Sequence, residues 1–318
     1  MQDATTIFKR HSDQPILSHR DLPGVAQVYN PGPAKVGDEY ILLVSVVDHA
    51  THEPGRDVGQ SRVARSKDGV HFELSTDNFI PHDDSEEPYS LFHHYIDPRI
   101  TPLEGYHYII TPAMVRGWDS PVGQLGRTKD FSPGSYERLG VISQPKNRGA
   151  SLFPEKIDGK YWKLDRPGGG EGSNGEIWIS SSPDMIHWGH FRPVQSPNYK
   201  FWNMNKMGPT PPIKTDRGWL EFVHGVFSPA GGTCYYVGAI LLDLEQPWKV
   251  IGRTQSYLMA PELPWETSGN CDNVVFACGV LPDYDKDELR LYYGATDCHI
   301  GLAIGSLSQT VDACVKGL

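Results

Sequence analysis

The sequence has no apolar run that approaches the roughly 18 residues needed to span a membrane. Its first residues have neither the basic nor the apolar region of a secretory signal. We therefore expect no membrane partner and a cytoplasmic location. Cysteine is also scarce, because the five cysteines are scattered and include no Cys-x-x-Cys pair. This spacing argues against a zinc site and a disulfide framework, and it fits reduced thiols in the cytoplasm.

Basic residues are fewer than acidic ones, 29 against 39, which gives a net charge of −10. Since nucleic-acid backbones call for a basic surface, we expect no nucleic-acid partner. Any anion site must be a local cluster of basic side chains. Long helical stretches rich in Ala, Leu, Glu and Lys are missing as well, whereas glycine (33) and proline (26) are abundant among the 318 residues. This composition is typical of many short strands and turns.

A two-part unit recurs five times along the chain. Its first half is a polar or proline-containing edge, a Gly/Asp turn and an aromatic-rich strand, found at residues 30–43, 97–110, 153–164, 210–223 and 276–293. Its second half is another strand, found at residues 63–72, 126–131, 177–188, 237–244 and 300–305. Repeated antiparallel units of this size are typical of a β-propeller. We predict an all-β five-bladed β-propeller, with residues 1–318 as a single domain; a large β-sandwich is the alternative.

The stretch Asp97-Pro98-Arg99 stands at the start of the second unit. Proline removes a backbone donor and biases Asp97 towards an extended conformation, so we expect its carboxylate at a strand end, facing a polar pocket. An ordinary Asp-Pro turn is the alternative. In a propeller the innermost strands line a central channel, and residues at their equivalent ends converge at one mouth. Those positions here are Asn30, Asp97, Arg148, Arg166, Lys206, His224 and Asp297.

The basic residues of this set allow two interpretations. They could pair locally with carboxylates, or they could clamp an oxyanion, because arginine forks and a lysine charge are what a phosphate needs. The glycine-rich stretch 168–172 lacks the Lys-Ser/Thr ending of a P-loop and is expected to be a loop between strands. Aromatic rings beside carboxylates at the channel mouth would suit glycoside chemistry.

A series of segments, taken in order, resembles glycoside hydrolase family 130, the inverting β-mannoside phosphorylases and related β-mannosidases. The segments are 30–34 (NPGPA), 61–69 (SRVARSKDG), 97–101 (DPRIT), 147–157 (NRGASLFPEKI), 165–167 (DRP), 218–226 (GWLEFVHGV), 241–244 (LLDL), 274–279 (VVFACG) and 292–297 (YYGATD). The resemblance spans nearly the whole chain. That family has a five-bladed propeller fold, in agreement with the repeat count.

The resemblance implies a role for each matching residue. Asp97 would be the general acid, acting through a hydroxyl of the bound mannose, while inorganic phosphate attacks the anomeric carbon from the opposite face and gives α-D-mannose 1-phosphate. The positions that would hold phosphate are Arg148, Arg166, Lys206 and His224. Those that would contact the sugar are Asn30, Arg62, Tyr236 and Asp297. The implied partners are a β-mannoside and phosphate as co-substrate, with no metal and no organic cofactor.

Two positions depart from the family pattern. Ser45 stands where arginine is often found, and Gly149 stands where an aspartate commonly follows the Asn-Arg pair. Retention of the basic set favours a phosphorylase over a hydrolase, since phosphate needs no activating base whereas water does. Glu266 is a carboxylate that could serve as that base or could lie at the surface.

Several alternatives stay open on sequence alone. An inverting β-mannosidase on the same scaffold is the second enzyme hypothesis, and a carbohydrate-binding propeller without activity is the third. The sequence does not fix the glycosidic linkage, the acceptor sugar or whether the protein forms a homo-oligomer. We expect the loops 83–89 and 168–174 to select the acceptor.

Overall fold

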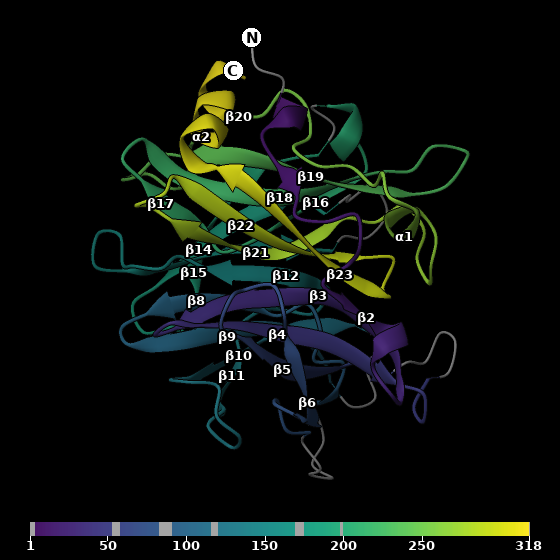
Figure 1. Cartoon of the computed structure of the whole chain (residues 1–318). Coiled ribbons are helices and arrows are strands. Elements are labelled where there is room, and N and C mark those ends of the chain that lie inside the picture. The colour runs from purple at the N-terminus through teal and green to yellow at the C-terminus, as the bar shows by residue number, and fades with distance from the viewer. Residues whose placement is uncertain are drawn as a thin grey trace.

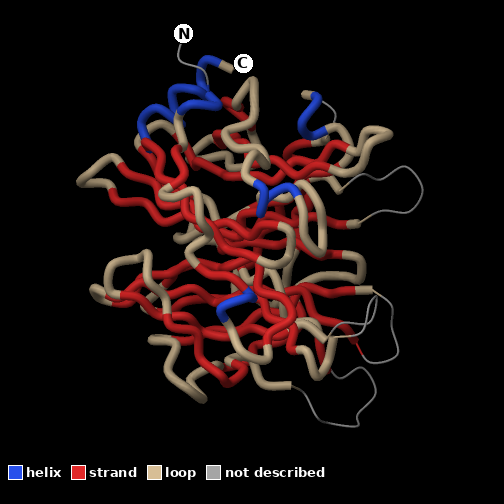
Figure 2. The backbone as a smooth tube through the Cα atoms, turned by 45° about the vertical axis from the view of Figure 1, so that its right-hand side comes forward, coloured by secondary structure: helices blue, strands red, loops and turns tan. Residues whose placement is uncertain are grey.

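A computed structural model describes residues 4–52, 58–82, 91–115, 120–168, 175–197 and 200–317. Within these residues the strands form five antiparallel sheets (Figure 1). Figure 2 shows that strands make up most of the chain and that helices are short. The predicted all-β five-bladed propeller is confirmed. The extent of a single domain over residues 1–318 stays a prediction.

The first three sheets follow one another along the chain and are called blades 1 to 3. Blade 1 contains β3 (Val25–Val36), β4 (Glu39–Asp48), β5 (Gln60–Ser66) and β6 (Glu73–Asn78). Blade 2 contains β7 (Leu91–His93), β8 (Arg99–Leu103), β9 (Tyr106–Val115), β10 (Pro121–Thr128) and β11 (Glu137–Val141). Blade 3 contains β12 (Asn147–Leu152), β13 (Tyr161–Pro167), β14 (Ile177–Ser182) and β15 (Gly189–Gln195).

The last two sheets complete the ring, and the chain's N-terminal part closes it. Blade 4 contains β16 (Lys206–Pro209), β17 (Ile213–Thr215), β18 (Gly218–Phe227), β19 (Cys234–Leu242) and β20 (Val250–Arg253). Blade 5 contains β21 (Phe276–Asp283), β22 (Glu288–Ala295), β23 (His299–Ser306), β1 (Lys9–Arg10) and β2 (Leu17–Ser18). Because β1 is the outermost strand of blade 5, the first and last parts of the chain share one sheet.

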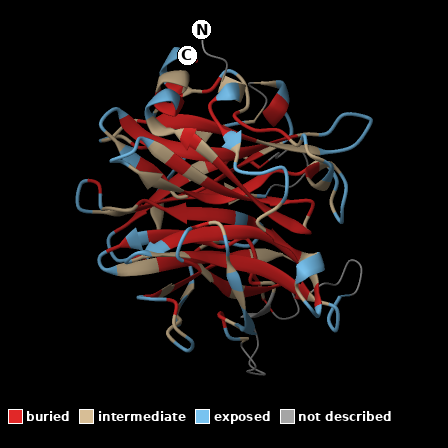
Figure 3. Cartoon of the chain, in the orientation of Figure 1, coloured by how far each residue is buried: buried red, intermediate tan, exposed pale blue. Residues whose placement is uncertain are grey.

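The sheets pack face to face, so each core is shared between neighbouring blades. Ile41 of β4 lies in one buried cluster with Ile109 and Ala113 of β9. Leu220 of β18 lies in another with Leu289 of β22. Strand residues are therefore buried on both faces over much of their length, as Figure 3 shows. Each such aliphatic side chain contributes about 1.5–3 kcal/mol through its burial.

The helices are peripheral. They are η1 (Ala4–Thr6), η2 (His19–Asp21), η3 (Phe201–Asn203), α1 (Pro264–Thr267) and α2 (Leu307–Lys316). The N-cap residue of α2 is Ser306, whose Oγ accepts the Gln309 N–H at 3.2 Å, and its Val311 and Cys314 are buried against the sheet. No helix in the described ranges is long and apolar enough to cross a membrane.

The innermost strands surround the channel: β3 contacts β8, β8 contacts β12, β12 contacts β16, and β21 contacts β3. Towards the end of each of these strands, or just after it, a proline from every blade lines one cavity of about 270 Å³, whose walls include Pro33, Pro102, Pro154, Pro211 and Pro282. A Cβ added at Gly279 would lie 2.9 Å from Cδ of Pro33 and 3.9 Å from Cδ of Pro211. Three blades therefore meet at this end of the channel.

Candidate active site

Asp97 lies two residues before the start of β8, at the end of the channel opposite the prolines, and only 6% of it is exposed. Its φ is +49°, so the extended conformation predicted from Pro98 is wrong. Two hydrogen bonds hold the unusual backbone: its N–H donates to Ser45 Oγ at 2.9 Å, and its carbonyl accepts from Arg99 Nη1 at 2.6 Å. Ser45 of blade 1 and Arg99 of β8 thus override the local preference.

The Asp97 carboxylate has a fixed partner in blade 1. Asn30 Nδ2 donates to Asp97 Oδ1 at 2.7 Å, and the Asn30 carbonyl accepts from Ser45 Oγ at 3.4 Å. Asn30 and Asp297 also have positive φ values, +44° and +57°. Such backbone conformations cost about 1–3 kcal/mol each in non-glycine residues and gather at functional sites. The structure therefore brings Asn30 and Asp97 together and ties both to Ser45.

Arg99 is a buried residue of the site that the sequence analysis did not single out. It is 2% exposed, and its Nε donates to the Pro209 carbonyl at 3.1 Å, which links blade 2 to blade 4. A Cβ at Gly149 would lie 3.6 Å from Arg99 Nη2 and 3.5 Å from Arg166 Nε. Gly149 therefore lies between two guanidinium groups. An aspartate at this position, as expected from the family pattern, would neutralise part of their charge.

Three of the predicted phosphate residues, Arg148, Arg166 and Lys206, lie close together. Burial, followed by the charges of Arg99 and Arg148, lowers the pKa of Arg166 to about 10. Burial, followed by the charges of Arg166 and Arg148, lowers the pKa of Lys206 to about 8, against the opposing effect of Asp97. Cations crowded in a half-buried place are stabilised by an anion. The structure thus gathers this cluster from blades 3 and 4 beside Asp97.

His224 is the fourth predicted phosphate residue and lies 1% exposed on β18. Its ring is 4.4 Å from that of Phe276, and a Cβ at Gly208 would lie 2.1 Å from His224 Cε1, so glycine is required there. Burial, followed by the charges of Arg166 and Lys206, keeps its pKa well below the ordinary value. Neither ring nitrogen has a hydrogen-bond partner among the described residues. A neutral imidazole can donate to a bound anion.

Two adjacent tyrosines of β19 face different surroundings. Tyr236, the predicted sugar contact, packs against Tyr257 at 5.2 Å and Phe201 at 6.1 Å. Tyr235 instead accepts a hydrogen bond at its Oη from Lys206 Nζ at 2.8 Å. Its pKa is raised, chiefly by burial. Tyr235 therefore belongs to the cation cluster. Successive side chains of a strand point to opposite faces, so the sequence predicts that only one of the two tyrosines faces the channel, but it does not say which one.

Asp297 and Arg62 occupy different places. Asp297 lies in the turn between β22 and β23, where its charge helps raise the pKa of Tyr235, so it borders the cation cluster. Arg62 lies on β5 of blade 1, and its Nη2 donates to Asp48 Oδ2 at 2.6 Å. Its Nε donates to Asn78 Oδ1 at 3.3 Å. Among the described residues, these hydrogen bonds of Arg62 lie within its own blade.

Glu266 is neither at the surface nor placed as a base, which corrects both expectations for it. It is fully buried, and it pairs with Arg10 through two hydrogen bonds of 2.8 Å. Tyr293 Oη donates to Oε1 at 2.7 Å, and the N–H groups of Glu262 and Leu263 donate to Oε2. Burial alone would raise its pKa, but these donors hold it below the usual value. Glu266 fastens the N-terminal strand to blade 5.

Parts of the predicted site fall outside the described residues. The expected acceptor loops lie there: all of 83–89, and 168–174 except Gly168. Within the described part of the chain, no group of three or more His, Cys, Asp or Glu side chains is arranged to hold a metal ion.

Comparison with known proteins identifies the family of the chain. The profile of glycoside hydrolase family 130, described as β-1,4-mannooligosaccharide phosphorylase, matches residues 5–316. A β-1,4-mannooligosaccharide phosphorylase of Ruminococcus albus is 32% identical, covering 98% of this chain and 91% of that protein. A 4-O-β-D-mannosyl-D-glucose phosphorylase of Bacteroides fragilis is 30% identical, covering 98% of this chain and 81% of that protein.

A solved structure extends the likeness to three dimensions. The β-1,2-mannobiose phosphorylase of Listeria innocua, in complex with β-1,2-mannobiose, matches with a TM-score of 0.85 at 27% identity, over 96% of this chain and 99% of that one. The resemblance noted in the sequence is confirmed. The chain belongs to glycoside hydrolase family 130.

Proposed function

We propose that this protein catalyses the inverting phosphorolysis of a β-mannoside, with Asp97 as general acid and α-D-mannose 1-phosphate as product. The relatives named above support the reaction class, because each is a phosphorylase of a β-mannoside. They differ in linkage and acceptor, so the comparison does not select one substrate. All five cysteines are free, which supports a cytoplasmic location.

The observation that carries the proposal is the cation cluster beside Asp97. Arg166 and Lys206 have lowered pKa values because they are buried among like charges, in a protein whose net charge is −10. Such an arrangement is costly unless an anion neutralises it. Phosphate supplies that charge, and its oxygens can accept from Arg166, Lys206 and the neutral His224.

The chemical step follows from the two sides of the site. A phosphate oxygen attacks the anomeric carbon while the bond from that carbon to the leaving oxygen breaks. Asp97 gives its proton to a hydroxyl of the mannosyl ring, and that hydroxyl passes its own proton to the leaving oxygen. Asn30 fixes one oxygen of the Asp97 carboxylate, so the other is free to face the sugar. The nucleophile is already an anion, so positioning it is sufficient and no second carboxylate is required.

The proposal is tested by incubating the protein with β-1,4-mannobiose, β-1,2-mannobiose and mannosyl-β-1,4-glucose, each with and without phosphate. We expect one of these disaccharides to give α-mannose 1-phosphate, detected by ³¹P NMR, only when phosphate is present. Release of free mannose at the same rate with or without phosphate would indicate a mannosidase and contradict the proposal.

A further inference from the structure

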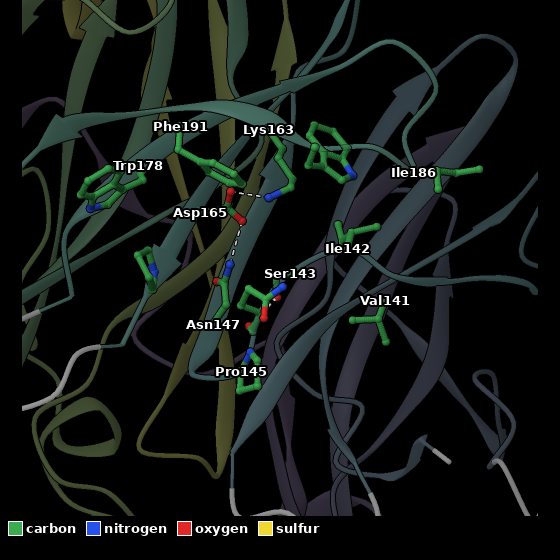
Figure 4. Close-up of a pocket in the computed structure, with 13 residues that line it drawn as sticks. Val141, Ile142, Ser143, Pro145, Asn147, Lys163, Asp165, Trp178, Ile186 and Phe191 are labelled. Carbon is green, nitrogen blue, oxygen red and sulfur yellow. Dashed lines mark hydrogen bonds and ion pairs between the residues drawn. The ribbon is translucent and has the colours of Figure 1, made fainter. Parts of the chain in front are cut away.

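A second pocket lies on the face of blade 3 that is turned towards the end of blade 2 (Figure 4). Its volume is about 540 Å³, which is in the range of small-molecule sites. Its walls include three aromatic side chains, Trp178 on β14, Trp188 in the turn after it and Phe191 on β15. Phe191 is 60% exposed, so an aromatic face is open to solvent at the rim.

The floor of this pocket is polar and charged. Asp165 accepts a hydrogen bond from Asn147 Nδ2 at 2.7 Å and pairs with Lys163, as the dashed lines in Figure 4 show. Asp165 is 4% exposed and Lys163 is 1% exposed. The Oδ1 atom of Asn147 is buried and has no hydrogen-bond partner among the described residues. An unpaired amide oxygen of this kind costs about 1–3 kcal/mol, so a ligand that donates to it is favoured.

The pocket is separate from the channel although it uses the same strand. Asp165 and Arg166 are consecutive residues of β13, and successive side chains of a strand point to opposite faces. Lys163 and Asp165 therefore face the pocket, whereas Arg166 faces the channel side with Lys206. Asn147 likewise precedes Arg148 on β12. A ligand in the pocket would not compete with phosphate.

We propose that this pocket is a second saccharide-binding site, which holds part of an oligomannoside chain outside the channel. The identity of the sugar rests on the proposed function. Aromatic rings pack on the C–H faces of a pyranose, while the amide, carboxylate and ammonium groups of the floor exchange hydrogen bonds with its hydroxyls. A purely apolar ligand would leave the polar floor desolvated, and an anion would meet Asp165. A sugar can pack on the aromatic walls and also form hydrogen bonds with the polar floor.

The consequence is a preference for longer chains. An oligosaccharide held in the pocket keeps its other units near the enzyme, which raises their effective concentration at the channel mouth. Because the two sites use opposite faces of β12 and β13, we expect that a disaccharide does not engage both at once. The second site is therefore expected to affect the turnover of long substrates only.

The test compares Phe191→Ala with Tyr284→Ala, a control at another exposed aromatic residue, 59% exposed, that follows β21 of blade 5. For mannohexaose of whichever linkage is turned over, Phe191→Ala should lower kcat/KM by about fivefold to tenfold, the loss of one aromatic contact. Its kcat/KM for mannobiose, and both values for Tyr284→Ala, should stay within about twofold of wild type. Equal values for mannohexaose in all three proteins would overturn the inference.

A binding measurement separates this inference from the proposed function. Asp97→Asn protein saturated with mannobiose is titrated with β-1,4- and β-1,2-mannohexaose, following tryptophan fluorescence. We expect the tryptophan fluorescence of Asp97→Asn to change on titration, and we expect no such change in the double variant that also carries Phe191→Ala. No change with either sugar would contradict the second site, whereas failure of mannobiose turnover by the wild type would contradict the proposed function alone.

Discussion

The carboxylate of Asp97 is held by contacts that come from two other positions in the chain, Asn30 and Ser45. The serine hydroxyl binds the backbone of both residues, and the asparagine amide binds one carboxylate oxygen. At the scale of single residues, the proposed acid therefore depends on blade 1 as much as on its own blade. Its partners are buried, so each of these bonds is protected from water.

Replacing Asp97 with asparagine should remove the proton donor while keeping the hydrogen-bond geometry. We expect kcat to fall by about 10²–10⁴-fold, the usual contribution of general acid catalysis. The melting temperature should change little. The control is Asp285→Asn, at an exposed position of blade 5, which should keep full activity. Near-normal turnover by Asp97→Asn would reject the assignment.

Ser45→Ala should affect both stability and activity. It leaves the buried Asp97 N–H without an acceptor, which costs about 1–3 kcal/mol of unfolding free energy. It also frees the backbone of the acid, so kcat should fall. Ser151→Ala is the matched control, because Ser151 is equally buried and its Oγ donates to the Thr210 carbonyl at 2.8 Å. Urea denaturation and steady-state rates on both variants would show whether the loss of activity is specific to Ser45.

Lys206 should make phosphate binding depend on pH. Its pKa is about 8 in the folded protein, so the ammonium form that attracts phosphate is present below pH 8 and is lost above it. We expect the KM for phosphate to rise by up to about tenfold per pH unit above 8. Lys206→Met should have a high KM at all pH values, and the exposed Lys249→Met should behave as wild type. A KM that is flat from pH 7 to pH 10 would argue against this role.

At the scale of elements, blade 5 depends on a strand of two residues, β1, joined to it by Arg10 and Glu266. Glu266→Gln should lower the unfolding free energy by about 1.5–3 kcal/mol, because it removes the buried charge that accepts from Arg10, Tyr293 and two backbone N–H groups, while Glu262 stays as a partner of Arg10. Activity at a temperature where the variant is folded should be unchanged. If Glu266 were a catalytic base, the variant would instead lose activity and keep its stability. Thermal denaturation and rate measurements distinguish the two.

The same ion pair fixes how stability responds to acid. The folded-state pKa of Glu266 is lowered, so its stabilising contribution is present above the unfolded-state pKa of about 4.3. This contribution is lost as the pH falls through the lower pKa that Glu266 has in the folded protein. Glu266→Gln should therefore show a weaker loss of stability in acid than wild type, measured by melting temperature between pH 3 and pH 6. Parallel curves for the two proteins would contradict this assignment.

The sequence predicted the elements better than the contacts between them. The five repeats mark the blades, because aromatic-rich strands and Gly/Asp turns are local patterns. The strand β1 is too short to show any period, and α2 is recognisable only by its Ser306 cap. The positive φ of Asp97 depends on a bond to blade 1, and the choice between Tyr235 and Tyr236 depends on a bond between Lys206 of β16 and Tyr235 of β19, which are distant in the sequence. A single sequence read locally does not contain that information.

At the scale of the whole molecule, an acidic protein gathers cations at one point. The net charge is −10, yet Arg148, Arg166 and Lys206 lie together at one mouth of the channel. The inner strands explain this, because they begin at that mouth and end at the prolines. Folding thus brings together residues more than 50 positions apart in the sequence, such as Arg148 and Lys206, and their charges make this mouth locally positive.

The prolines at the other end have a kinetic consequence. Pro33 and Pro211 pack beside Gly279 there, whereas the proposed acid and the cation cluster lie at the opposite end among the described residues, so we expect sugar and phosphate to enter, and both products to leave, through the mouth beside Asp97. Whichever substrate lies deeper has to arrive first, and its product has to depart last. We expect a compulsory-order sequential mechanism, in which one product competes with only one substrate in initial-rate inhibition experiments. Product-inhibition patterns of a random-order mechanism would contradict this expectation.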